Sequence, residues 1–269
     1  MDWNNHLTRH EFAQRVLAMN EGAWPDMEGL IRDIYVNLVH PGRCMLDVGV
    51  NHGVHLVQMA RTVGPAGRVI GFEAVPELVQ RTRDAITHHY PDTASQIELH
   101  NLAVSDHAGT AQFHYSKAND GGLSGFANRA VLSIGPVETI EVPITTIDEV
   151  VDDNFVDRLD FAKFDIEGAE YHAFLGARRV LARQPVLAFE WDRDAPAYFH
   201  YQPADLLGLL HAHGYDVYDL FGFSYPDVES LTTAQVWNFV AVPVQRDAKQ
   251  VLYPSIGTFL ANFPDVLNG

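Results

Sequence analysis

The sequence predicts an α/β protein built on a doubly wound, mostly parallel sheet. Short apolar runs of strand length alternate with segments whose apolar residues recur at helical spacing. Such runs, placed between helices, are typical of parallel strands that are buried on both faces. The last two runs follow each other with no clear helix between them, which predicts an antiparallel last strand.

The individual elements follow in order along the chain. Two helices are expected within residues 7–39, where "PDMEGLIRDIYVNLV" has helical spacing. The predicted strands are 44–50, 68–74, 97–104, 159–166, 185–191, 215–221 and 236–243. The helices between them are expected at about 54–62, at 76–89 behind a proline, from the fourth strand to about 182, and across "PADLLGLLHAHG".

An insertion interrupts this alternation within residues 109–151. The runs "GTAQFHY" and "ETIEVPI" flank the glycine-rich stretch "NDGGLSGFAN", which predicts an inserted β-hairpin around a mobile segment. The whole chain has 269 residues, 47% of them hydrophobic, which is enough for one large domain. We expect a helical segment over 1–40, the main α/β domain over 41–245 and a C-terminal tail over 246–269. Three alternatives stay open for residues 1–40. They form a lid, they pack on the sheet edge, or they contact a second subunit of a homo-oligomer.

The charge balance restricts the partners. The chain carries 18 Lys and Arg against 35 Asp and Glu, a formal charge of −17 that works against binding to nucleic acid or to an anionic membrane. The N-terminus lacks the basic start and apolar run of an export signal, and the single Cys44 excludes an intrachain disulfide. Because the apolar stretches are far shorter than the roughly 20 residues that span a bilayer, we expect a cytoplasmic protein.

The loop after the first strand has the features of a nucleotide site. In "LDVGVNHGVH" the strand ends at Asp47 and turns through Gly49 and Gly53 into a helix, so that backbone N–H groups face a ligand. Glu73, at the end of the second strand, is placed to accept hydrogen bonds from both ribose hydroxyls. Each feature alone is also compatible with an ordinary turn, and only the combination predicts a nucleotide cofactor.

The identity of the nucleotide depends on two residues of this loop. A dinucleotide loop requires a glycine at its middle position, where this chain has Asn51. The negative charge of Asp47 opposes a pyrophosphate but suits a cationic amino-acid group. Both residues favour S-adenosylmethionine over NAD.

Acidic residues gather at the ends of the fourth and fifth strands. In "KFDIEGAE", Asp165 ends a strand and is predicted to serve the chemistry, whereas Glu170 is assigned to the first helical turn, where the dipole contributes about 0.3–1 kcal/mol. For Glu167 both interpretations stay open. Glu190 ends the next strand at the same edge. Three roles stay open for Glu190. It shares proton transfer with Asp165, it binds Mg²⁺ together with Asp165, or it pairs with an arginine such as Arg193.

Further candidates surround this edge. His52 follows the cofactor loop and is a candidate to contact the acceptor beside the sulfonium, with a packing role as the alternative. A set of aromatic residues is either a wall over the acceptor or ordinary core: Phe126, Trp191, Tyr198, Phe199 and Tyr201.

The motifs "LDVGVNHG", "VIGFEAVP", "NLAVSD", "VPITTIDEV" and "AKFDIEGAEYHAFLGA" occur in this order over roughly residues 43–243. They resemble the FkbM-type family of S-adenosylmethionine-dependent methyltransferases. The resemblance implies a class I methyltransferase fold and, commonly, methylation of a hydroxyl on a natural product or sugar. The residues it implies are Asp47, Gly49, Asn51 and Gly53 for the methionine part, Glu73 for the ribose, Asn101, Leu102 and Ala103 for the adenine, and Asp165 with Glu167 for the reaction centre. His52 stands where the pattern leads us to expect a small or aliphatic residue, and the stretch 191–201 has no counterpart in the pattern.

The expected function is therefore an S-adenosylmethionine-dependent O-methyltransferase acting on a small molecule. Two alternatives are an N-methyltransferase acting on a small-molecule amine and a non-catalytic nucleotide-binding partner subunit. The presence of Asp47, Gly49, Glu73 and Asp165 argues against the non-catalytic alternative.

Overall fold

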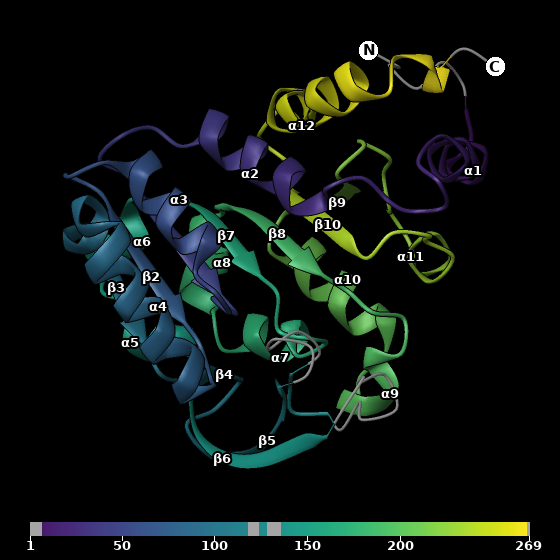
Figure 1. Ribbon diagram of the computed structural model, residues 1–269. Helices are drawn as coiled ribbons and strands as arrows, with labels where there is room; N and C mark the ends of the chain where they lie inside the picture. Colours follow the sequence, from purple (N-terminus) through teal and green to yellow (C-terminus); the bar gives the residue numbers. More distant parts are fainter. Residues whose placement is uncertain (1–6, 118–123, 128–135, 268–269) are drawn as a thin grey trace.

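The computed structural model describes residues 7–117, 124–127 and 136–267, and it has the predicted α/β architecture. A central sheet carries helices on both sides (Figure 1). In spatial order its strands are β3 (Ile97–His100), β2 (Arg68–Phe72), β1 (Cys44–Val48), β7 (Leu159–Phe164), β8 (Val186–Glu190), β10 (Asn238–Pro243) and β9 (Tyr215–Asp219). The chain runs outward from β1 to β3 and then returns to β7, so the crevice at which such sheets bind ligands lies at the carboxyl ends of β1 and β7.

The strand directions agree with the sequence pattern. Strand β1 pairs in parallel with β2 and β7, and β7 pairs in parallel with β8. Strand β10 is antiparallel to both β8 and β9, which confirms the predicted antiparallel last strand. Every residue of β1 is buried, as expected for a strand covered on both faces.

The helices begin where their capping residues predict. Asp26 accepts a hydrogen bond of 2.9 Å from the backbone N–H of Gly29 at the start of α2, and Pro76 opens α4. The longer helices are α1 (Arg9–Met19), α2 (Met27–Leu38), α3 (Val54–Val63), α4 (Pro76–His89), α10 (Pro203–Ala212) and α12 (Ala248–Asn262). The shorter ones are α5 (Ile147–Val150), α6 (Asp153–Asp157), α7 (Glu170–Leu175), α8 (Arg178–Arg183), α9 (Ala195–Phe199) and α11 (Val228–Thr232). The expected C-terminal tail thus contains a helix, α12, which packs against α2 (Figure 1).

Two sequence expectations need correction. The predicted strand 97–104 is divided, because the side-chain amide of Asn101 donates to the backbone oxygens of Glu73 and Ala74 at 3.0 and 2.9 Å and the chain leaves the sheet there. The helix expected up to about 182 is broken into α7 and α8 at Gly176, where a Cβ would overlap the backbone oxygen of Ser105.

The inserted segment forms a small second sheet. Its strands, in spatial order, are β4 (Ala103–Val104), β6 (Val137–Thr145) and β5 (Gly109–Ser116). The antiparallel pairing of β5 with β6 confirms the predicted inserted strands. Most of the glycine-rich stretch between them, which we expected to be mobile, lies outside the described residues.

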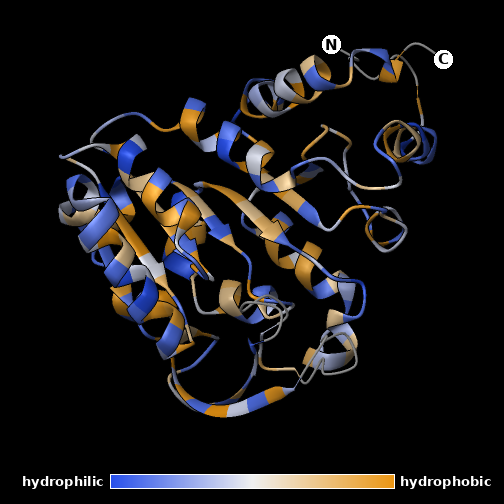
Figure 2. Ribbon diagram, in the orientation of Figure 1, coloured by the Kyte–Doolittle hydropathy of each residue, from blue (hydrophilic) through white to orange (hydrophobic). Residues whose placement is uncertain are grey.

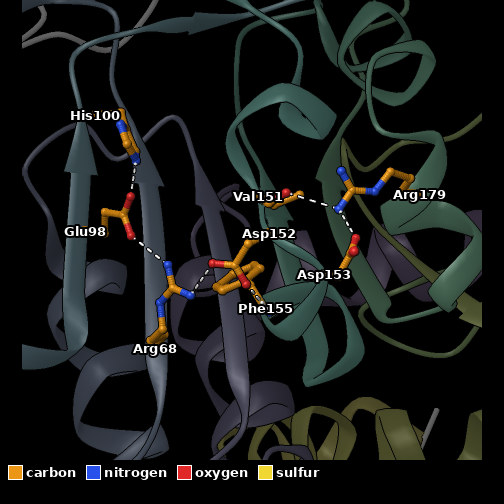
Figure 3. A network of polar contacts seen from close by, with 8 residues as sticks. All are labelled: Arg68, Glu98, His100, Val151, Asp152, Asp153, Phe155 and Arg179. Carbon is orange, nitrogen blue, oxygen red and sulfur yellow. Dashed lines mark hydrogen bonds and ion pairs between the residues drawn. The ribbon is translucent and has the colours of Figure 1, made fainter.

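Hydrophobic residues concentrate on the central strands and on the sheet-facing sides of the helices (Figure 2). At the amino ends of the strands, by contrast, arginines bridge acidic side chains (Figure 3). Arg68, the first residue of β2, contacts Glu98 at 2.8 Å and Asp152 at 2.7 Å, and Arg179 contacts Asp153 at 2.8 Å. Among the described residues, no helix combines the length and the apolar character needed to cross a membrane.

Candidate active site

A cavity of about 280 Å³ lies at the carboxyl ends of β1, β2, β7 and β8. Small-molecule sites usually have volumes of roughly 300–1,000 Å³, so the size is close to that of a ligand pocket. The lining comprises Glu28, Val48, Gly49, Asn51, Phe72, Glu73, Ala74, Leu102, Ala103, Val104, Phe113, Ser124, Phe126, Asp165, Ile166, Glu167, Glu190 and Trp237. Most of the residues predicted for the cofactor and the chemistry therefore face one common space.

The loop from β1 to α3 forms one wall of the cavity. Gly49 has a φ of 90°, and a Cβ at this position would overlap the backbone oxygen of Asp165. Glycine therefore allows the loops after β1 and β7 to approach each other. Asn51, with a φ of 49°, lines the cavity, and its buried Oδ1 atom has no hydrogen-bond partner among the described residues. A buried orphaned oxygen beside an open cavity is available to a ligand.

Glu73 connects this loop to the end of β2. Its side chain is 7% exposed, and its two carboxylate oxygens accept backbone hydrogen bonds of 2.8 Å from Asn51 and Val75. Burial raises the pKa of Glu73, while these hydrogen bonds oppose the shift. Each oxygen retains capacity for a second hydrogen bond. The position is compatible with the predicted contact to a ribose, which stays a prediction.

Three residues predicted for the cofactor do not line the cavity. Asp47 lies beneath the loop at 1% exposure, and neither of its carboxylate oxygens has a hydrogen-bond partner among the described residues. Burial raises the pKa of Asp47 to about 6, against the opposing effect of Lys163. Gly53 faces Thr82 instead, and Asn101 holds the backbone at the end of β2, while its neighbours Leu102 and Ala103 line the cavity.

The predicted reaction centre is assembled from two strand ends. Asp165, Glu167 and Glu190 all line the cavity, and their carboxyl groups bring oxygens within 4.8 Å of one another. Burial raises the pKa of Glu190 well above its usual value, and the neighbouring Asp165 adds to the shift. A side-chain hydrogen bond joins Glu190 to Asp165, and it raises the pKa of Glu190 while it lowers that of Asp165. Glu167 has a φ of 57°, a strained conformation for a residue with a side chain.

A buried lysine accounts for the ionised state of Asp165. The side chain of Lys163 is 5% exposed, and its Nζ lies 2.8 Å from Asp165 Oδ2 and 3.8 Å from Glu28 Oε2. Burial alone would raise the pKa of Asp165, but the ammonium group of Lys163 and the hydrogen bond to Glu190 together lower it. Burial likewise opposes the charge of Lys163, but the surrounding carboxylates hold its pKa above the ordinary value.

The sequence interpretation missed Lys163, Glu28 and Trp237. A lysine inside the apolar run "LDFAKF" is a signal that was available, since a charge in a strand buried on both faces requires a partner. Glu28 comes from the first turn of α2 and reaches the cavity only through tertiary packing, where it also contacts His55 Nε2 at 2.6 Å. The position of Trp237 before β10 has no local signal.

Glu170 has a feature that the sequence did not indicate. It is the first residue of α7, as predicted, and its side chain is completely buried. Its carboxyl group accepts a hydrogen bond of 2.9 Å from the backbone N–H of Ile166. Burial raises the pKa of Glu170 to about 8, so the group is largely protonated at neutral pH.

The remaining candidates lie outside the cavity, apart from Phe126. His52 lines a neighbouring hollow on the other side of the loop, so its position gives no support to a catalytic role. Trp191 and Tyr201 are buried and joined by a hydrogen bond of 3.1 Å between their side chains, while Tyr198 is exposed. None of these three residues lines the cavity, and the alternative of ordinary core fits Trp191 and Tyr201. Phe126 does line the cavity.

The carboxyl cluster has the oxygen donors that a divalent cation prefers. Against a cation, the ammonium group of Lys163 already contacts Asp165 at 2.8 Å, and two positive charges at one carboxylate repel each other. The donor set therefore does not identify this cluster as a metal site.

Comparison with known proteins places the chain in a family. The model of the methyltransferase FkbM domain matches residues 47–217. A match of 67 residues at 34% identity links the chain to an uncharacterized 37.1 kDa protein in transposon TN4556 of Streptomyces fradiae, and it covers 24% of this chain and 19% of that protein.

Among solved structures, the chain is similar to methyltransferase FkbM from Methylobacillus flagellatus, at 18% identity and a TM-score of 0.45, over 87% of this chain and 57% of that one. It is also similar to the O-methyltransferase TomG from Streptomyces achromogenes, at 11% identity and a TM-score of 0.42, over 87% of this chain and 89% of that one. Because the family model covers well over half of the chain, this protein belongs to the FkbM family of S-adenosylmethionine-dependent methyltransferases.

Proposed function

We propose that this protein is an O-methyltransferase that transfers the methyl group of S-adenosylmethionine to a hydroxyl of a small molecule, a natural product or a sugar. The observation that carries the proposal is the pair Asp165 and Glu190 at the cavity, where the buried ammonium group of Lys163 lies 2.8 Å from Asp165 and lowers the pKa of that carboxyl group. A hydroxyl acceptor has to lose its proton during methyl transfer, and an ionised carboxylate at the cavity is the group that accepts it.

The cavity has groups that suit the cofactor. The close approach of the loops at Gly49, the orphaned Asn51 Oδ1 and the carboxylate of Glu73 would hold its amino-acid and ribose parts, with Leu102 and Ala103 beside the adenine. When bound, S-adenosylmethionine supplies an electrophilic methyl group on its sulfonium and leaves as a neutral thioether.

The acidic residues then perform the proton transfer. As the bond from the acceptor oxygen to the methyl carbon forms, the hydroxyl proton moves to the carboxylate of Asp165. The hydrogen bond between Glu190 and Asp165 helps to orient the accepting carboxylate. Lys163 compensates the negative charge of Asp165 before the transfer. Its hydrogen bond to Asp165 Oδ2 fixes the orientation of the carboxylate.

The test is single-turnover methyl transfer in a screen of hydroxylated natural products and sugars. Asp165→Asn should lower the rate a hundredfold or more, about 2.7 kcal/mol of transition-state stabilisation. Its affinity for S-adenosylhomocysteine should stay nearly unchanged in calorimetry. The matched control is Asp160→Asn, which changes an acidic residue at the other end of the same strand, paired there with Arg43 at 2.7 Å. A fully active Asp165→Asn variant with a lowered melting temperature would assign this carboxylate to the scaffold.

The same assay separates the alternatives. Turnover confined to amines, with little loss in Asp165→Asn, would indicate an N-methyltransferase, because a neutral amine needs electrostatic support more than a base. Binding of S-adenosylhomocysteine without any turnover would indicate a non-catalytic subunit. We expect EDTA to leave turnover unchanged, because Lys163 already occupies Asp165. Reversible loss in EDTA, restored by Mg²⁺, would assign Asp165 and Glu190 to a metal.

A further inference from the structure

A second, open hollow of about 460 Å³ adjoins the cavity. It is lined by Glu190 at the end of β8, by residues 191–194 after it, and by residues 234–237, which precede β10. Glu190 and Trp237 line both spaces, so the hollow borders the reaction centre. Two hydrogen bonds of 2.8 Å join the loops, from Trp191 N to Trp237 O and from Arg193 Nη2 to Ala234 O.

The hollow is rich in hydrogen-bond acceptors with negative charge. Asp192 and Asp194 lie on the loop after Glu190, and the guanidinium group of Arg193 is directed to a backbone oxygen of the opposite loop. The flat side chain of Trp237 is 42% exposed. Aromatic faces of this kind provide a large apolar contact area beside polar groups.

An orphaned oxygen lies next to the same strand end. Asn238 is 5% exposed, and its Oδ1 atom has no hydrogen-bond partner among the described residues. It stands directly opposite Glu190 in the antiparallel pair of β8 and β10. Opposite residues of such a pair project to the same face of the sheet, but Asn238 lines neither the cavity nor the hollow.

We propose that the hollow between residues 190–194 and 234–237 binds the non-reacting part of the methyl acceptor, and that this part is a ring rich in hydrogen-bond donors, without a phosphate or carboxylate group. The proposal rests on the proposed methyl transfer to a small-molecule hydroxyl. Hydroxyl or ammonium donors pair with the carboxylates of the hollow while the ring lies on Trp237. An anionic acceptor would meet Asp192, Asp194 and a chain with a formal charge of −17.

The experiment uses the full chain saturated with S-adenosylhomocysteine and three matched probes at pH 7: methyl glucoside, glucosamine and glucose 6-phosphate. Binding is measured by saturation-transfer NMR. We expect the neutral and cationic probes to bind and the phosphorylated probe to bind at least tenfold more weakly. A comparison of the affinities for glucosamine and methyl glucoside shows whether the hollow prefers ammonium or hydroxyl donors. Trp237→Ala should weaken the binding of methyl glucoside at least fivefold. The control is Tyr253→Ala, which removes a 69% exposed aromatic side chain on α12 and should leave this binding unchanged.

A separate variant tests the role of negative charge in the hollow. Asp194→Asn should raise binding of the phosphorylated probe at least twofold relative to methyl glucoside. The proposal is overturned if none of the probes binds to the S-adenosylhomocysteine complex or if the phosphorylated probe binds best. It is also overturned if Trp237→Ala binds methyl glucoside as tightly as the wild type. These results leave the proposed function intact as long as calorimetry shows S-adenosylhomocysteine binding. Absence of that binding would contradict the proposed function, and the acceptor subsite with it.

Discussion

The two ends of the central sheet both carry acidic side chains, but in opposite states. At the amino ends, Asp152 is half exposed and paired with Arg68, whose hydrogen bond lowers the pKa of Asp152 (Figure 3). At the carboxyl ends, Asp47 and Glu170 are buried, and burial raises their pKa values to about 6 and about 8.

The difference shows which acids serve the fold and which cost stability. Exposed pairs at the amino end gain little free energy and lose little when they are removed. Buried acids at the carboxyl end destabilise the fold unless a partner or a proton compensates them. Sites where such a cost persists are candidates for function. Lys163 is the buried cation that keeps this end compatible with folding.

The largest expected effect is therefore that of Lys163→Met. Removing one partner of a buried charge pair typically costs about 3–5 kcal/mol, and here it leaves Asp165 and Asp47 without their cation. Denaturant unfolding at pH 7 measures the loss, with Arg68→Met as the counterpart at the amino end. An equal, small loss in both variants would remove the contrast between the two ends.

Glu170→Gln tests the protonated acid. The pKa of Glu170 is raised above the ordinary 4.5, so its contribution to stability is complete below about pH 4.5 and is lost as the pH rises towards 8. We expect the variant to lack this loss and to be more stable than the wild type at pH 9 by on the order of 2–3 kcal/mol. Unfolding at pH 5 and pH 9 provides the comparison. A variant that loses stability in parallel with the wild type would exclude Glu170 as the cause.

Glu73→Ala tests the cofactor side of the carboxyl end. The wild type should bind S-adenosylhomocysteine in the micromolar range, around −8 kcal/mol. The variant should bind it more weakly by roughly 1–3 kcal/mol, through lost hydrogen bonds of a charged group. Calorimetry measures both, and Glu98→Ala, an acidic residue at the amino end of the neighbouring strand, is the control. Unaltered binding by Glu73→Ala would place the ribose elsewhere.

Much of this arrangement could be predicted from the sequence because it depends on local pattern. The strand runs, the turn at Gly49 and the acids at strand ends follow from apolar spacing and from the rule that ligands bind at carboxyl ends. The exposure of Glu170 could not be predicted, because the first turn of a helix faces solvent or core depending on what packs over it. Glu28 and Trp237 join the cavity from distant segments, and apolar spacing carries no information about such contacts.

The division of residues 97–104 shows the same limit. The run has strand character throughout, but its pattern does not say which sheet each part joins. The side-chain amide of Asn101 ends the pairing with β2, and Ala103 then pairs with β6 of the small sheet. A contact between residues 28 positions apart along the chain decides the outcome.

The smallest expected effect is that of Arg68→Gln at the amino end. Arg68 contacts Glu98 and Asp152, and its guanidinium group lies 5.5 Å from the ring centre of Phe155 (Figure 3). Since these side chains are partly exposed, we expect a loss of about 0.5–1 kcal/mol that shrinks in 1 M NaCl, with S-adenosylhomocysteine binding unchanged.

The pH dependence of this small loss should be opposite to that of Glu170. The pKa of Asp152 is lowered, so the stability from its pairing is present above the unfolded pKa and disappears as the pH falls through the folded one. Arg68→Gln should therefore approach wild-type stability in acid, well below the ordinary aspartate pKa of 3.8, whereas Glu170→Gln differs most from the wild type at alkaline pH. Unfolding of both variants across this range provides the measurement. A loss in Arg68→Gln that persists in acid and high salt would mean that packing on Phe155, rather than charge, holds the amino end together.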